Sequence, residues 1–225
     1  MPTVISRDGT TIGFDARGKG PPLVLVAGAT QYRAVDRVTP AFADLLADRF
    51  TVVIYDRRGR GESGDTMPYA VAREIEDIEA LLDAHGGRGM LFGMSSGAVL
   101  ALEAAAALAG KVTGAVLYEP PVDPGQAPAE SWKRHAEMAA LQSEGRSEEM
   151  MVRFLQGVGM PDDALEGFRR SPVWPLFAAV GLTIEHDYRV MAEAAGTGHP
   201  PQRWQQIGAP VLVVNGDASF PFLAA

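Results

Sequence analysis

The chain has 225 residues, of which 47% are hydrophobic and 21% are charged, so one sizeable folded core is expected rather than a disordered chain. The formal net charge of −8 disfavours nucleic acid and anionic membranes as partners, because both require clustered lysine and arginine. The absence of cysteine excludes disulfides and thiolate metal sites. The start of the chain does not resemble a signal peptide, and no apolar run reaches about 18 residues. These features favour a cytoplasmic protein with no membrane span.

The first 120 residues alternate between strand-like and helix-like patterns. Residues 3–6 and 10–14 flank Asp8-Gly9, a pair that tolerates positive φ, and together they predict a β-hairpin. Four apolar runs are typical of strands buried on both faces of a parallel sheet, at residues 23–26, 51–55, 89–92 and 112–118. Three intervening segments have the spacing or composition of helices, at residues 35–50, 69–85 and 98–109.

Residues 121–200 have a different pattern. Strand-like runs are missing there, and amphipathic helical segments rich in methionine, tryptophan and phenylalanine take their place. Strand character returns at residues 210–215. We therefore expect an α/β fold with a mostly parallel, twisted sheet flanked by helices. Its core would comprise residues 1–120 plus 201–225, with residues 121–200 inserted as a helical cap.

The sequence Gly93-Met94-Ser95-Ser96-Gly97 lies between a predicted strand and a predicted helix. A G-x-S-x-G segment in that position forces a sharp, strained turn, which raises the serine hydroxyl above the sheet. The two glycines allow the strand and the helix to approach where a side chain would collide. The motif predicts that Ser95 is a nucleophile. A serine that only caps the following helix is the alternative, and it stays open for Ser96.

Three other features stand beside this motif in chain order. A buried strand ends in Ala27-Gly28, the segment Tyr55-Asp56-Arg57-Arg58-Gly59-Arg60-Gly61-Glu62-Ser63 follows the next strand, and a helical block comes after the serine motif. In this combination the chain resembles the α/β-hydrolase superfamily over nearly its whole length, with Ala27 where the family usually has histidine. The resemblance implies an α/β-hydrolase fold with a cap and an oxyanion hole made by the backbone N–H groups of Ser96 and Ala29. It implies no metal and no organic cofactor.

The acid of a catalytic triad is less well defined by the resemblance. The usual family position corresponds to Ser219, so the pattern is broken there. The resemblance offers Glu119 instead, because some family members take the acid from the end of the strand before the cap. Asp217, two residues before Ser219, is the other candidate. A structural carboxylate and a turn residue, respectively, are the competing interpretations.

The general base is missing from its usual place, because the family histidine follows a further strand and no histidine follows His199. Three explanations stay open: the last strand and helix of the fold are absent from this chain, a partner chain supplies the residue, or the protein is not catalytic. His186, flanked by Glu185 and Asp187, is a minor candidate for a substitute base. An unfinished sheet edge would also make a homo-oligomer plausible.

Large apolar side chains are candidates for a substrate pocket, namely Met94, Trp132, Trp174 and Phe177, although helical core packing explains any one of them as well. The leading hypothesis is a serine hydrolase acting on a small ester, thioester, lactone or related acyl substrate. Two alternatives are a cofactor-free biosynthetic cyclase or lyase on the same fold, and a non-catalytic binding protein that has lost the triad histidine.

Overall fold

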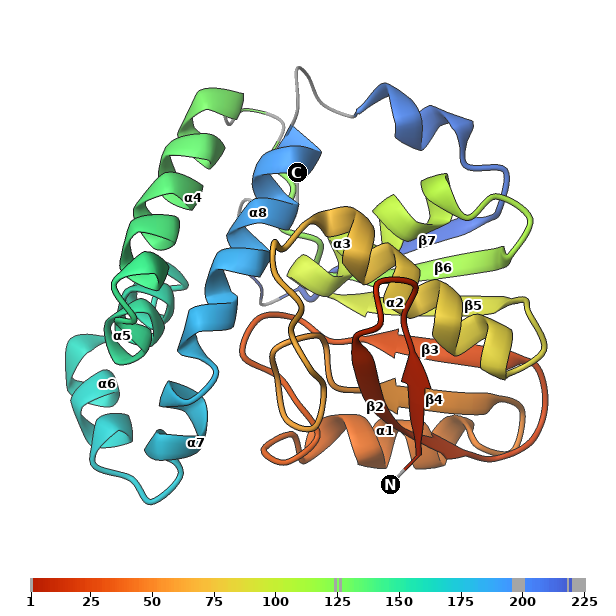
Figure 1. Cartoon of the computed structure of the whole chain (residues 1–225), viewed down its shortest axis with the longest axis horizontal. Coiled ribbons are helices and arrows are strands. Elements are labelled where there is room, and N and C mark those ends of the chain that lie inside the picture. Colours follow the sequence, from red (N-terminus) through yellow and green to blue (C-terminus); the bar gives the residue numbers. More distant parts are fainter. Residues whose placement is uncertain (1, 124, 126, 196–200, 218, 220–225) are drawn as a thin grey trace.

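The computed structural model describes residues 2–123, 125, 127–195, 201–217 and 219. These residues form a seven-stranded sheet in the order β1-β2-β4-β3-β5-β6-β7 (Figure 1). The pairs β1–β2 and β2–β4 are antiparallel, and the remaining pairs are parallel, which confirms the predicted α/β fold. The strands are β1 (Thr3–Ile5), β2 (Thr11–Arg17), β3 (Pro22–Val26), β4 (Thr51–Tyr55), β5 (Gly89–Met94), β6 (Val112–Tyr118) and β7 (Val211–Val214).

Helices cover both faces of the sheet, as the apolar strands require. Side chains alternate along β3, so that Val24 and Val26 pack on one face beneath α2 and α3, whereas Leu23 and Leu25 pack on the other face against α1. These helices are α1 (Val38–Leu46), α2 (Val71–Ala84) and α3 (Ser96–Ala107). The helix predicted at residues 35–50 is therefore shorter at both ends.

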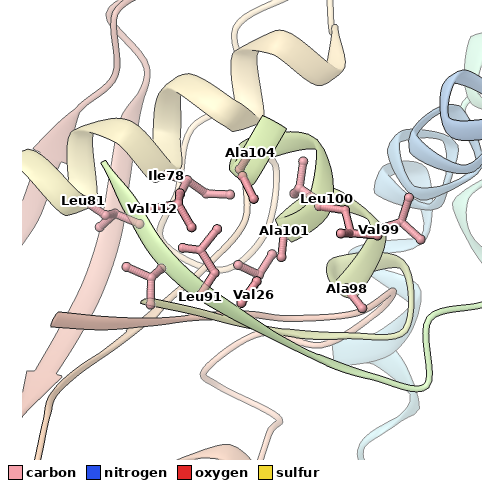
Figure 2. Close-up of a cluster of buried hydrophobic side chains, with 14 of the residues drawn as sticks. Val26, Ile78, Leu81, Leu91, Ala98, Val99, Leu100, Ala101, Ala104 and Val112 are labelled. Carbon is pink, nitrogen blue, oxygen red and sulfur yellow. The ribbon is translucent and has the colours of Figure 1, made fainter. Parts of the chain in front are cut away.

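Helix α3 is the most deeply buried helix of the core. Its small side chains allow this deep burial. Ala98, Ala101 and Ala104 are fully buried and pack towards the strands, where Val26 and Leu91 meet them (Figure 2). Alanine brings a helix axis close to the sheet with no side-chain entropy lost. This close packing fixes the start of α3, where the Gly93–Gly97 motif lies.

A helical block occupies the side of the molecule next to the sheet (Figure 1). It consists of α4 (Pro128–Ser143), α5 (Ser147–Gly157), α6 (Asp162–Arg169), α7 (Trp174–Ala178) and α8 (Ile184–Ala195), with a 3₁₀ turn at Gly181–Thr183. The block has a hydrophobic core of its own, which includes Leu141, Met150 and Trp174. Helix α8 contacts both α4 and α3, so it joins the block to the core.

A second 3₁₀ segment, Gln202–Gln206, precedes β7. The strand predicted around residues 210–215 is present, but the four side chains of β7 stay exposed, in contrast to those of β3. Among the described helices, none combines the length and the apolar character that crossing a bilayer would require.

Candidate active site

The turn between β5 and α3 has the strained geometry that the sequence predicts. Ser95 has φ +53° and ψ −126°, a left-handed conformation that costs a non-glycine residue about 1–3 kcal/mol. The turn is held by backbone bonds on both sides: the Ser95 N–H donates to the Tyr118 carbonyl at 2.9 Å, and the Ala98 N–H donates to the Ser95 carbonyl at 2.8 Å. The strain is therefore maintained by the strand on one side and the helix on the other.

The two glycines of the motif are required by backbone contacts. A Cβ atom on Gly93 would lie 2.4 Å from the carbonyl oxygen of Gly97. A Cβ atom on Gly97 would lie 2.3 Å from the carbonyl oxygen of Val26. Because both obstructing atoms belong to the backbone, neither can rotate away, and the turn can form only with glycine at these positions.

Ser95 and Ser96 border a cavity of about 410 Å³ between the core and the helical block. Ala29 lies on the core side, and Phe154, Val158 and Met191 form much of the apolar wall on the block side. No described residue hydrogen-bonds to the Ser95 hydroxyl, which leaves its oxygen accessible to a bound molecule. The remaining lining residues are Pro121, Asp123, Ser131, Arg134, Gly157, Asp187 and Tyr188.

The Ser96 hydroxyl, unlike that of Ser95, is firmly held. It donates to the Asp187 carboxylate of α8 at 2.7 Å. The same carboxylate accepts hydrogen bonds from Arg57 and Arg60, each at 2.5 Å. Burial alone would raise the pKa of Asp187, but the two guanidinium groups outweigh it and hold that pKa below its usual range. In the sequence, Asp187 stands out only as a neighbour of His186, and no pattern connects it with Ser96.

Both candidate acids lie at the carboxyl end of the sheet. Glu119 follows β6 directly, with φ +50°, and its Oε1 accepts a hydrogen bond from the Gly216 N–H at 3.2 Å. Asp217 is the next residue after Gly216 and is exposed. Neither carboxylate lines the cavity. Glu119 is nonetheless next in sequence to Tyr118, whose carbonyl holds the Ser95 N–H, so this strand end adjoins the serine turn.

None of the described histidines lines the cavity at Ser95. His186 is buried between the core and the block, where its ring stacks on Tyr69 at 3.8 Å between centroids. Burial lowers the pKa of His186 to about 4. His135 pairs with Glu185 at 2.6 Å, and the Nδ1 of His85 lies 2.7 Å from a carbonyl of its own helix. His199 lies outside the described residues.

None of the four predicted pocket side chains lines the cavity at Ser95. Met94 lines a separate cavity of about 380 Å³ beside α1, because neighbouring strand residues point to opposite faces. Trp174 and Phe177 pack around Phe168 in the core of the helical block. Trp132 is 41% exposed, with its ring edge against His135. The apolar wall of the cavity at Ser95 is formed instead by Phe154 and Val158, at the end of α5, and by Met191 of α8.

Comparisons with known proteins agree on one family. The model of the alpha/beta hydrolase family matches residues 23–225. The crystal structure of an alpha/beta hydrolase from Sphaerobacter thermophilus is 42% identical, with a TM-score of 0.83, and the match covers 99% of this chain and 85% of that one. The esterase RhEst1 from Rhodococcus is 25% identical, with a TM-score of 0.59, over 96% of this chain and 80% of that one.

A curated relative matches over a shorter stretch. The uncharacterized hydrolase YraK of Bacillus subtilis is 35% identical over 103 residues, which are 42% of this chain. The matched region spans only about a third of that protein, 35% of its length.

Proposed function

The chain belongs to the alpha/beta hydrolase family, and from this premise we propose that it is a serine hydrolase acting on a small ester, thioester, lactone or related acyl substrate. The observation that carries the proposal is the Ser95 turn, in which a serine with φ +53° borders a cavity of about 410 Å³. In a G-x-S-x-G turn, the strained conformation exposes the serine hydroxyl at the end of the sheet, where it can attack a bound acyl group. The esterase likeness supports an ester in particular.

In the proposed reaction the Ser95 oxygen attacks the carbonyl carbon of the substrate, and its proton passes to a general base. The carbonyl oxygen becomes an oxyanion, which the N–H groups of Ser96 and Ala29 would stabilise. Ser96 is suited to this role because it opens α3, and the first N–H groups of a helix have no intrahelical acceptor. Collapse of the intermediate breaks the C–O or C–S bond, and the base gives its proton to the leaving oxygen or sulfur, which in a lactone stays attached to the acyl group. Water then hydrolyses the acyl-enzyme.

We propose the remaining groups of the mechanism from their positions relative to the serine turn. We place Glu119 ahead of Asp217 as the acid that would orient the base, because its carboxylate is held at the strand end beside the serine turn. We assign the base to none of the described histidines, because none of them lines the cavity. A histidine outside the described residues, or one supplied by a partner chain, would take the Ser95 proton. The apolar wall of Phe154, Val158 and Met191 fits a small aliphatic or aromatic acyl group.

Ser95→Ala tests the proposal directly. Wild-type protein should hydrolyse p-nitrophenyl acyl esters and be labelled by a fluorophosphonate probe, and Ser95→Ala should lose both, with turnover falling at least about 10³-fold. Ser143→Ala is the matched control, because that hydroxyl is exposed and bonds only to its own helix. Equal turnover in wild type and Ser95→Ala would refute the proposal. Absence of labelling in the wild type would favour the cyclase, lyase or binding alternatives.

A further inference from the structure

Asp187 of α8 contacts the serine turn directly. It lies 91 residues after Ser96 in the chain, yet its Oδ1 accepts a hydrogen bond from the Ser96 hydroxyl at 2.7 Å. The carboxylate also lines the cavity, although only 3% of the residue is exposed. A buried carboxylate thus connects the helical block to the residue that directly follows Ser95.

The carboxylate is fixed in orientation by two buried arginines. Arg57 donates to its Oδ1 and Arg60 donates to its Oδ2, so the carboxylate cannot rotate without breaking a charged hydrogen bond. Arg57 is itself held by a bidentate pair with Glu74, at 2.6 and 2.7 Å. Arg60 is held by bonds to Thr183 and to the Gly28 carbonyl. The network would satisfy both arginines without Ser96, so the bond to the hydroxyl is an addition.

That additional bond acts on the residue whose N–H the proposed oxyanion site needs. The Ser96 side chain and its N–H share one Cα atom, and restraining the hydroxyl restrains the rotation of the peptide plane that carries the N–H. We propose that Asp187 is a positioning residue, which through the Ser96 hydroxyl fixes the direction of the Ser96 N–H towards the cavity. The inference rests on the proposed function of the Ser95 site.

The same contact makes the oxyanion site dependent on the helical block. Tyr188 and Met191 follow Asp187 on α8 and line the cavity, so a substrate that packs against them touches the helix that holds Ser96. The preceding residue, His186, stacks on Tyr69, which gives α8 a second contact with the core. The block therefore sets the geometry of the oxyanion site as well as the shape of the pocket.

Two variants and one control test this role. Ser96→Ala removes the hydroxyl and leaves the charged network intact, whereas Asp187→Asn weakens the acceptor. Each should lower kcat about tenfold with KM within about twofold, because an ill-directed donor weakens binding of the transition state only. The kcat of the double variant should be little lower than the kcat of either single variant, because both substitutions remove the same hydrogen bond. Asp77→Asn is the matched control, since Asp77 is a buried partner of Arg58 away from the cavity, and kcat should stay at the wild-type value.

A readout independent of turnover separates this inference from the proposed function. The amides of Ser95 and Ala98 donate the two hydrogen bonds that close the turn, and their exchange with solvent can be followed by NMR. In Ser96→Ala, both amide protons should exchange about tenfold faster than in wild type, whereas in Asp77→Asn their exchange rates should stay unchanged. Unchanged exchange in Ser96→Ala overturns the inference even if the wild type proves inactive. In an active wild type, an unchanged kcat in Ser96→Ala overturns it as well.

Discussion

The serine turn and the helical block hold their shapes by different means. At the turn, backbone packs directly on backbone, and the positions of Gly93 and Gly97 leave no space even for a methyl group. In the block, methionine and aromatic side chains fill the core, and the helices meet through flexible groups. The turn is therefore specified by a few adjacent residues, whereas the block is specified by many contacts between distant ones. The site at Ser95 needs both.

Gly97→Ala should have the largest effect of the substitutions that probe this difference. The new Cβ atom would lie 2.3–2.4 Å from the carbonyl oxygens of Val26 and Ala27, so strand and helix must separate. We expect a loss of at least about 3 kcal/mol in the free energy of unfolding, measured with urea, together with loss of Ser95 labelling.

Gly114→Ala is the matched control for that substitution. Gly114 lies in β6, where an added Cβ atom would meet its nearest neighbour, Met90, at 3.4 Å, which is ordinary contact. The free energy of unfolding of this variant should lie within about 1 kcal/mol of the wild-type value. A Gly97→Ala protein with the same urea midpoint as Gly114→Ala would show that backbone contact does not define the turn.

The same difference explains how far the sequence could predict the molecule. The strands, the helices of the core and the Ser95 turn follow from local patterns: apolar runs, helical spacing and two glycines at fixed positions. Each of these patterns spans only a few neighbouring residues, so it can be recognised in the sequence alone. The order of the strands in the sheet depends on contacts between distant residues, and only the structure shows it.

The contacts between the core and the block carry no such local signal. Arg57, Arg58 and Arg60 look equivalent in the sequence, but Arg57 and Arg60 bind Asp187 beside the cavity, whereas Arg58 binds Asp77 and Asp8. Which partner each arginine takes depends on helices that are brought together only by folding. For the same reason the tryptophans of the block were expected at the pocket and are found elsewhere.

The junction between core and block should respond to acid, through His186. Its pKa is lowered from 6.5 to about 4 in the folded protein, so between these values the unfolded chain binds more protons, and stability falls as the pH falls. From pH 7 to pH 5 this amounts to about 2 kcal/mol in the free energy of unfolding. Burial is the largest cause; Arg57 and Arg60 add to it, while Glu74 and Asp187 oppose it. Asp65 and Glu185 lie 3.6 and 3.9 Å from its Nε2.

His186→Phe isolates this contribution, because phenylalanine keeps a ring against Tyr69 and binds no proton. Its urea midpoint should change less between pH 7 and pH 5 than that of wild type. Parallel curves for the two proteins would show that another group controls the acid response of the junction.

Gly167→Ala should change the free energy of unfolding least, and it should stabilise the protein, whereas Gly97→Ala destabilises it. Gly167 lies within α6 of the helical block, where an added Cβ atom meets nothing within 4 Å and the backbone has no positive φ. Alanine then only restricts the unfolded chain and favours the helix, so we expect a gain of about 0.5–1 kcal/mol, measured by urea unfolding, with unchanged turnover. A methyl group that is prohibitive at Gly97 would thus be favourable at Gly167. If Gly167→Ala destabilised the protein, open space around the added methyl group would not determine the outcome, and the contrast with Gly97 would fail.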